Sequence, residues 1–356
     1  MKQPKESALA SSQDANLLLS ASDSRNRKGI SMKDSQSWQA TIQASISIRP
    51  LEEKDLQAAD HIMRLAFGTF IGLPNPADFL GDANYVHSRW HANPGNAFAA
   101  EVDGKLVGSN FATNWGSVGF FGPLTTHPDI WDCKVGSRLI EPVIARFDEW
   151  NITHAGLFTF PNSAKHHGLY QKFGFWPQFL TMVMAKRVEL ESTDLRWTTF
   201  SEIAEDKRDE VLQAFRDLTD EIYAGLDVRS EVLAGARANL GETVLLFDDT
   251  GLAAVAVCHF GPGTEAGSGT CYIKFGIARP GPMVEQHFGN LLEACEAMAS
   301  QKGLVRLAAG VNTARHEAYR QMLTRGFRAQ IQGVVMQRNN QTGYNRSGVY
   351  VIDDWR

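Results

Sequence analysis

Apolar and polar residues alternate along several short stretches of the chain after residue 45. The stretch ISIRP at 46–50 alternates as a strand does, and a run with helical spacing follows it. The stretch AFAAEVDGKLVGSNFATNWG predicts a hairpin about Asp103-Gly104, because this dipeptide favours a tight turn. The stretch SVGFFGPLTTHP predicts a third strand, which Pro128 ends. This part of the chain therefore begins as strand, helix, hairpin and strand.

Apolar residues then recur at steps of three and four over residues 135–150, which predicts an amphipathic helix. Pro142 lies inside this stretch, so we expect either a kink or a later helix start. The stretch HAGLFTF predicts a short apolar strand, PNSAKHHGLYQ a helix, and GFWPQFLTMVMAKRV a final strand.

The same order of elements returns in the second half of the chain. ETVLLFDDTGLAAVAVCHF predicts a hairpin, TCYIKFGIARP a strand ended by proline, FGNLLEACEAMASQKG a helix and LVRLAAGV a strand. A helix, the strand FRAQIQGVVMQR and a last strand in GVYVIDDWR follow. Matching positions are Gly136 with Gly289, Leu139 with Leu292, Asn162 with Asn312, and Gly174-Phe175 with Gly326-Phe327. We interpret the pattern as a tandem duplication of one α+β unit, with a period of about 150 residues.

Residues 1–44 show no such pattern and are rich in Ser, Gln, Ala, Lys and Asp. Such a segment cannot bury enough apolar surface to offset the entropy lost on ordering, so we expect it to be disordered. The predicted domains are therefore a tail at 1–44, a first unit at 45–190 and a second unit at 191–356.

Composition narrows the classes of partner. The net charge is −5 at pH 7, which argues against a nucleic-acid partner. The four cysteines never fall into a CxxC spacing, so neither a disulfide framework nor a zinc site is indicated. No apolar run reaches the roughly 18 residues of a membrane helix, and the start lacks the apolar region of a secretory signal. We expect a soluble cytoplasmic protein with no membrane partner, either a monomer or a homodimer.

The order of elements in each unit resembles that of the GNAT superfamily of acetyl-CoA-dependent N-acyltransferases. The resemblance covers about residues 45–337. In the first unit it rests on SIRP with an acidic helix start, on HPDIWDCKVGSRLI and on PNSAKHHGLYQKFGF. The resemblance implies an α+β fold of two tandem GNAT-like domains, each a mixed, mostly antiparallel sheet flanked by helices.

The resemblance also implies acetyl-CoA as co-substrate. In the family, the pyrophosphate binds backbone N–H groups at a helix N-terminus, here the loop 131–137, and the strand before it holds the pantetheine and thioester oxygen. The chain departs from the family at Trp131, Asp132 and Lys134, where Arg and Gly are usual; Asp132 would repel phosphate and Lys134 would attract it. Asn162 would contact the pantetheine or cap the next helix. The implied cofactor-binding residues are Leu124, Thr125, Thr126, Trp131, Asp132, Cys133, Lys134, Val135, Gly136, Ser137 and Asn162.

Tyr170 stands at the family's tyrosine position, where the resemblance implies a general acid that protonates the departing thiolate. The alternative is a core aromatic residue on an amphipathic helix. The second unit has Met322 at this position, and methionine cannot donate a proton; Tyr319 lies one turn earlier. We therefore interpret the second unit as a degenerate copy with a structural or substrate-forming role.

An amine acceptor is charged near neutral pH and must lose a proton before it attacks. His127 and Glu101 are the candidate bases, and ordered water is the alternative. Adjacent residues such as His166 and His167 point roughly 100° apart on a helix, which disfavours a metal site.

We therefore predict an N-acyltransferase that moves an acetyl group from acetyl-CoA to the amine of a small-molecule or peptide acceptor, with Tyr170 as general acid. The acceptor would enter between the units, in part along residues 67–80. The alternative is a non-catalytic protein that binds or senses acyl-CoA or another small ligand, and a protein-binding scaffold is a third possibility.

Overall fold

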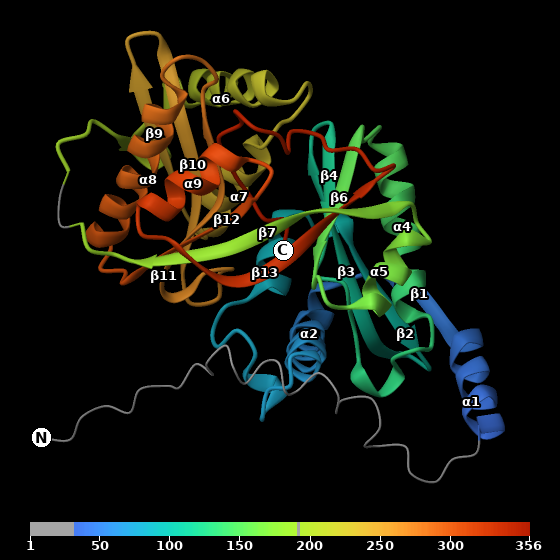
Figure 1. The fold of residues 1–356 in the computed structure, drawn as a ribbon. Coiled ribbons are helices and arrows are strands. Elements are labelled where there is room, and N and C mark those ends of the chain that lie inside the picture. The colour runs from blue at the N-terminus through green and yellow to red at the C-terminus, as the bar shows by residue number, and fades with distance from the viewer. Residues whose placement is uncertain (1–31, 191–192) are drawn as a thin grey trace, which may run out of the picture.

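The computed structural model describes residues 32–190 and 193–356. Its strands form one fourteen-stranded sheet that runs through both halves of the chain, with helices packed against it (Figure 1). The main path of the sheet has the order β1-β2-β3-β4-β6-β13-β7-β12-β11-β10-β9-β8, and the short strands β5 and β14 pair with β3 and β11.

Within the described residues, the first half supplies seven strands and five α-helices in the order that the sequence predicts, with α1 and α3 in addition. The strands are β1 (Ile46–Pro50), β2 (Ala97–Val102), β3 (Lys105–Trp115), β4 (Val118–Phe121), β5 (Thr125–Thr126), β6 (His154–Thr159) and β7 (Phe175–Arg187). The helices are α1 (Met32–Ser45), α2 (Leu56–Phe70), α3 (Tyr85–Ala92), α4 (Val135–Glu149) and α5 (Ala164–Gln171). Helix α4 begins where the sequence predicts and continues through Pro142.

The second half repeats this order. Its strands are β8 (Thr198–Thr199), β9 (Gly241–Asp248), β10 (Gly251–Gly261), β11 (Gly267–Ala278), β12 (Arg306–Asn312), β13 (Arg328–Arg338) and β14 (Val351–Ile352). Its helices are α6 (Arg208–Ile222), α7 (Arg229–Ala238), α8 (Val284–Gln301) and α9 (His316–Thr324). The strand predicted in GVYVIDDWR is confirmed, but it is only two residues long.

The expected disorder of residues 1–44 is wrong for the last part of that segment. Residues 32–45 form helix α1, and Ile42 packs against the hydrophobic cluster under α4. This contact gives the helix apolar surface to bury, which the composition of the segment as a whole does not suggest. Residues 1–31 lie outside the described part of the chain.

Each unit contributes one strand that pairs with a strand of the other unit. β13 from the second half lies between β6 and β7, with Val334 opposite both Thr159 and Leu180. β7 from the first half lies between β13 and β12, with Val183 opposite Gly310. The segments predicted as separate units, 45–190 and 191–356, therefore share one sheet, and each supplies a strand to the other.

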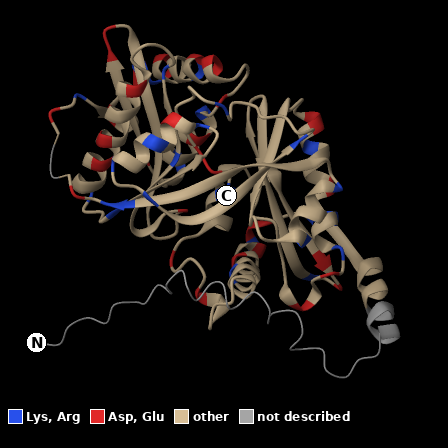
Figure 2. Cartoon of the chain, viewed as in Figure 1, with Lys and Arg blue, Asp and Glu red and all other residues tan. Residues whose placement is uncertain are grey.

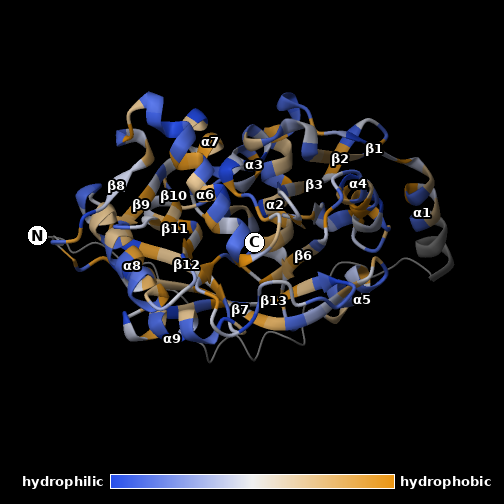
Figure 3. Ribbon diagram, turned by 90° about the horizontal axis from the view of Figure 1, so that it is seen from above, coloured by the Kyte–Doolittle hydropathy of each residue, from blue (hydrophilic) through white to orange (hydrophobic). Residues whose placement is uncertain are grey.

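Helices cover the two faces of the first half differently. Side chains alternate between faces along β3, so that Ala112 belongs to the cluster under α4 while Phe111 belongs to the cluster under α2 and α3. Hydrophobic residues concentrate on the strands and on the inner sides of the helices (Figure 3). Acidic and basic residues are interspersed over both halves (Figure 2).

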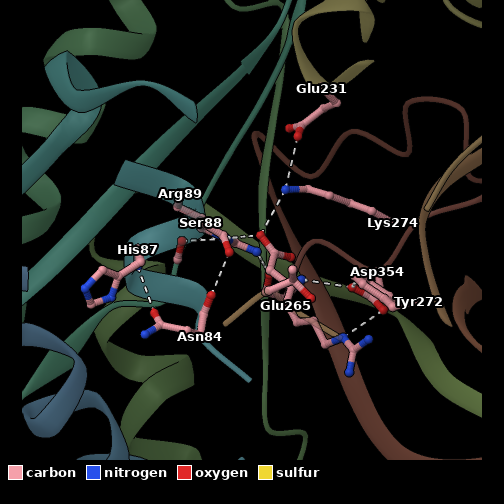
Figure 4. Close-up of polar contacts among 12 residues, drawn as sticks. Asn84, His87, Ser88, Arg89, Glu231, Glu265, Tyr272, Lys274 and Asp354 are labelled. Atoms are coloured by element: carbon pink, nitrogen blue, oxygen red, sulfur yellow. Dashed lines mark hydrogen bonds and ion pairs between the residues drawn. The ribbon is translucent and has the colours of Figure 1, made fainter. Parts of the chain in front are cut away.

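A buried network of charged residues joins the halves (Figure 4). Lys274 on β11 lies 3.1 Å from the Glu231 carboxylate and 2.9 Å from that of Glu265. Arg89 on α3 pairs with Glu265 from the other side at 3.3 Å, and the Trp115 indole donates to Glu231 at 2.9 Å. The network therefore ties α3 and β3 of the first half to α7 and β11 of the second.

His154 and His259 are completely buried, and neither ring nitrogen of either has a hydrogen-bond partner. Burial, helped by Arg315 near His154 and by Lys274 near His259, lowers the pKa of each to about 4. In the unfolded chain both histidines have the ordinary pKa of about 6.5, so the unfolded state binds protons more readily than the folded state. The resulting stability is therefore complete above about pH 6.5 and is lost as the pH falls toward 4.

We expect the free energy of unfolding to fall by about 3 kcal/mol per histidine between pH 7 and pH 4, an upper value from the two pKa shifts. Urea unfolding at several pH values measures the slope. His259→Gln should flatten that slope by its own share. A slope between pH 6.5 and 4 that is the same in wild type and variant contradicts the assignment.

Candidate functional site

Two neighbouring parallel strands separate in the first half. β4 pairs with β6 from Val118 opposite His154 to Phe120 opposite Gly156. After Phe121 the chain turns away, and β5 pairs with β3 instead, with Thr125 opposite Ser109. β6 continues to Thr159 without β5 beside it. The backbone edge of β5 that faces β6 is therefore not used by the sheet.

The predicted thioester-contacting residues lie on this open edge. The His127 N–H donates to the Val107 carbonyl on β3, and alternate residues of a strand point their backbone groups to opposite edges. Leu124 and Thr126 therefore direct their N–H groups away from β3, whereas Thr125 faces β3. The Thr126 carbonyl, on the open edge, accepts a hydrogen bond from the Trp131 indole at 3.0 Å.

The loop before α4 contains both buried and exposed members of the predicted phosphate-binding set. Cys133 and Val135 are buried, whereas Asp132 and Lys134 are exposed. Asp132 and Lys134 have φ of 71° and 63°, in the left-handed region where glycine is the usual residue. The helix start has no side-chain cap, so the first-turn N–H groups of Val135, Gly136 and Ser137 remain available to an anion.

The charge of Asp132, which the sequence predicts to repel phosphate, is paired in the structure. The Lys165 ammonium on α5 lies 2.7 Å from the Asp132 carboxylate and 5.5 Å from the centre of the Trp131 ring. The two charged side chains are both more than half exposed, so the pair contributes little to stability. Its consequence is local: it neutralises Asp132 and connects the loop to α5.

Helix α5 carries Tyr170 in its last turn and begins at a cap. Ser163 accepts a hydrogen bond from the His166 N–H at 3.4 Å, so Ser163 caps the helix. The capping role considered for Asn162 is therefore wrong. Asn162 is exposed in the loop just before the helix, so a contact with pantetheine stays a prediction.

The Tyr170 side chain points inward and is 7% exposed. Its ring packs edge-on against Phe121, the last residue before the strands part, at 5.9 Å. Burial raises the pKa of the hydroxyl well above its usual range, although a hydrogen bond with the Thr159 side chain opposes this shift. The phenol therefore stays protonated at neutral pH, as a proton donor must.

Both candidate bases are engaged by neighbouring residues. The His127 Nδ1 accepts a hydrogen bond from the Asp129 N–H at 3.3 Å. The Glu101 carboxylate lies 2.5 Å from Arg49, and its strand β2 is separated from β5 by β3. The structure does not bring Glu101 to the edge of β5 that faces β6.

The corresponding place in the second half is filled by the chain itself. β11 pairs with β12 from Thr270 to Ile273, and the two strands then separate as β4 and β6 do. Here β14 occupies the edge, with Ile352 opposite Gly276 and Val351 opposite Ile277. The pattern of pairing is thus the same in both halves, but only the first leaves an edge free.

Side chains reinforce this closure of the second half. Arg315 is buried and donates to the Val351 carbonyl at 3.0 Å and to Asp353 at 2.7 Å. Met322, at the position of Tyr170, is completely buried. A Cβ on Gly289 would lie 2.5 Å from the Arg325 guanidinium, so α9 covers the face of α8 that carries this glycine.

Sequence reasoning missed an aromatic row at the end of β6. The rings follow one another from the loop after α2, through α2 and the residue after β6, to α5. In order they are Phe79, Phe67, Phe160, Phe70, His166 and Tyr170. The sequence offered one signal of this row, the four aromatic residues between positions 67 and 85. The residues that complete the row, Phe160 and His166, lie about 90 residues further along the chain.

A cavity of about 260 Å³ is lined by residues of the second half, and one of about 170 Å³ lies between Lys186 of β7 and residues of the second half. Neither is lined by residues of β5. Across the described residues, no three His, Cys, Asp or Glu side chains gather as metal ligands would. Over the same residues, no helix combines the length and apolar character needed to cross a membrane.

Comparison with known proteins agrees with this geometry. Residues 61–175 match the model of the acetyltransferase (GNAT) family, and this segment runs from α2 to the start of β7. The first half of the chain is therefore similar to the GNAT acetyltransferases over these residues. The search of curated proteins gives no match.

Solved structures extend the similarity of fold to both halves. An acetyltransferase candidate from Pyrococcus horikoshii has a TM-score of 0.61 at 13% identity, over 87% of this chain and 95% of that one. A GCN5-related N-acetyltransferase from Sphaerobacter thermophilus has a TM-score of 0.55 at 13% identity, over 83% and 95%. A GCN5-related glucosamine N-acetyltransferase region of a fungal multi-domain GH3 β-N-acetylglucosaminidase has a TM-score of 0.57 at 11% identity, over 82% and 38%. The predicted α+β fold of two GNAT-like units is confirmed.

Proposed function

We propose that the chain is an acetyl-CoA-dependent N-acetyltransferase with one active site, in the first half. The observation that carries this proposal is the separation of β4 and β6, which leaves the edge of β5 free beside Tyr170. The match of residues 61–175 to the acetyltransferase (GNAT) family supports this class of reaction.

The residues present fit acetyl-CoA. Uncapped N–H groups at Val135, Gly136 and Ser137 suit a pyrophosphate, and the pairing of Asp132 with Lys165 removes the nearest repulsive charge. Pantetheine carries amide groups that can pair with the free edge of β5, as an added strand would. The acyl group would then lie near Leu124 and Tyr170.

The chemistry follows from these positions. The neutral amine nitrogen attacks the thioester carbonyl carbon, and the N–H groups of Leu124 and Thr126 stabilise the charge that develops on its oxygen. The C–S bond then breaks, and the thiolate takes the Tyr170 proton while the cationic nitrogen of the new amide loses one to solvent. Tyr170 regains a proton from solvent, which restores the phenol for the next turnover. Glu101 pairs with Arg49 away from this edge, and the Nδ1 of His127 already accepts from the Asp129 N–H, so solvent water is the simplest acceptor of that proton.

Among the described residues of the second half, β14 occupies the corresponding edge and Met322 stands in place of the tyrosine, which leaves no equivalent site there. We infer that it serves as a structural partner that completes the sheet of the first half through β13. One molecule of coenzyme A should therefore bind per chain.

Calorimetric titration with coenzyme A tests the binding part of this proposal, and thiol release from acetyl-CoA with a panel of amines tests turnover. Ser137→Glu should weaken binding at least about tenfold, because the new carboxylate lies in the first turn of α4. Gln286→Glu is the matched control in the first turn of α8 and should change nothing. Two sites per chain, or equal effects of both variants, would contradict the assignment. Tight binding without turnover for any amine would favour the sensor instead.

A further inference from the structure

The aromatic row passes around the end of β6, from one face of the sheet to the other. Phe67 and Phe79 stack at 5.4 Å on the side of α2, and Phe67 lies 6.1 Å from Phe160. Phe160 follows β6 directly and lies 4.7 Å from Phe70, whose ring is 5.0 Å from His166 on α5. The row ends beside Tyr170, which belongs to the cluster under α4.

The path of the chain after α2 is built to bring these rings together. Pro76 lies so close to Gly68 that a Cβ on this glycine would sit 2.2 Å from the Pro76 carbonyl oxygen. The close approach folds the segment that follows α2 back along the helix and places Phe79 against Phe67. Arg64 fixes the same fold by donating to the carbonyls of Phe79 and Ala83.

These rings are not ordinary core residues. Phe67, Phe70, Phe79, Phe160 and His166 are all only partly buried. Among the described residues, Phe67 borders a hydrophobic cluster, whereas Phe70, Phe79 and Phe160 belong to none. A contiguous, partly exposed apolar surface beside a site of chemistry is typical of a substrate-binding surface.

The carboxylates around the row are already engaged by other side chains. Asp60 pairs with Arg64 at 2.7 Å, Asp78 accepts a hydrogen bond from Asn75, Asp82 accepts from Ser268, and Asp132 pairs with Lys165. Arg64 and Lys165 neutralise Asp60 and Asp132, whereas Asp78 and Asp82 accept only from neutral groups and keep their charge. A polyamine or a lysine-rich peptide is bound best by several unpaired carboxylates, and half of these four are already paired with a cation.

The charge state of His166 suits an apolar occupant as well. Its Nδ1 is buried without a hydrogen-bond partner, and its ring lies between Phe70 and Tyr170. Burial, with Lys165 and His167 nearby, lowers its pKa to about 4, so the ring is neutral at pH 7.

We infer that the aromatic row binds the acceptor, and that the acceptor is a primary amine on an aromatic or similarly flat apolar body. This inference rests on the proposed function and adds the class of substrate to it. The apolar body would stack on Phe70 and Phe160, which places the amine near Tyr170 at the end of the row. The faces of the rings attract the ammonium form of the acceptor when it first binds. The apolar surroundings then lower the pKa of the amine and favour the neutral form that must attack.

The test compares phenethylamine with spermidine as acceptors for acetyl-CoA, in wild type and in Phe70→Ala and Phe160→Ala. We expect a higher kcat/KM for phenethylamine, and a rise of its KM by about tenfold or more in both variants. The Kd for coenzyme A should stay within about twofold. Phe247→Ala is the matched control, because this ring is 46% exposed on β9 of the second half. Phe70→Leu, which keeps apolar bulk, separates a loss of stacking from a folding defect.

A preference for spermidine, or equal kinetics in wild type and both variants, overturns the inference and leaves the proposed function standing. A strong preference for octanoyl-CoA over acetyl-CoA that Phe70→Ala removes would also overturn it, since the row would then hold the acyl chain. If no amine is acetylated, the proposed function fails, and calorimetry of phenethylamine with the coenzyme A-loaded chain decides the inference. Binding that Phe70→Ala weakens tenfold supports it, and no binding overturns it.

Discussion

Tyr170→Phe is expected to lower kcat for acetyl transfer by roughly 10²–10⁴-fold, the usual contribution of a general acid. The phenol is the proton donor of the proposed reaction, and its raised pKa keeps it protonated throughout the neutral range. Phenylalanine retains the ring that packs against Phe121, so the Kd for acetyl-CoA should change by less than about twofold. Thiol release under saturating acetyl-CoA measures the effect.

Two controls separate catalysis from packing. The melting temperature of Tyr170→Phe should stay close to that of wild type, since only one hydroxyl and its contact with Thr159 are lost. Tyr319→Phe makes the same change in the second half, one turn from Met322, and should leave turnover unaltered. Turnover by Tyr170→Phe at the wild-type rate removes the tyrosine from the mechanism and leaves a core aromatic residue.

Much of the fold follows from local pattern, and the first unit shows why. Strands β2 and β3 are two largely buried segments, and Asp103-Gly104 marks the turn between them with positive φ at both positions. The apolar spacing of α4 likewise predicts its start at Val135. These signals are local, so a single sequence is sufficient to find them.

The pairing of distant strands has no local signal. Nothing in the sequence of β13 indicates that it lies between β6 and β7, because strands about 150 to 180 residues apart pair through backbone groups that every residue carries. The filling of the second site by β14 was missed for the same reason. The sequence indicated the degenerate copy through Met322 and through a loop before α8 that lacks a basic cluster, whereas the structure adds the pairing of β14 with Gly276 and Ile277.

In the candidate site, too, the sequence predicts what depends on local order and misses what depends on contacts between distant residues. Tyr170 and the loop before α4 were predicted from their order along the chain, but the contact between Asp132 and Lys165 was not. The aromatic row depends on Phe160 and His166 meeting residues of α2, which only the fold can determine. Side chains that act together across elements are therefore the part of the site that sequence reasoning misses.

Lys274→Met is expected to destabilise the chain by about 3–5 kcal/mol at pH 7, the usual result of removing one partner from a buried ion pair. Lys274 is 7% exposed and is the shared partner of Glu231 and Glu265, which are 6% and 4% exposed. Burial alone would raise the pKa of Glu265, but Lys274 and Arg89 outweigh it and lower that pKa to about 2. Without Lys274, Glu231 keeps only the Trp115 indole, and Glu265 keeps Arg89 at 3.3 Å.

The pH dependence identifies the cause of that loss. In wild type the lowered pKa of Glu265 contributes stability that is complete above about pH 4.5 and is lost as the pH falls toward 2. In Lys274→Met the carboxylates lose the cation that keeps them ionised, so their pKa values rise and protonation relieves the buried charge at a higher pH. The loss of unfolding free energy in the variant, measured by urea unfolding, should therefore be largest at pH 7 and smaller at pH 5.

Lys207→Met is the control: it removes an exposed pair with Glu210 and should cost less than about 0.5 kcal/mol at both pH values. A deficit for Lys274→Met that is small, or that does not change with pH, would show that the network does not hold the two halves together through its charge.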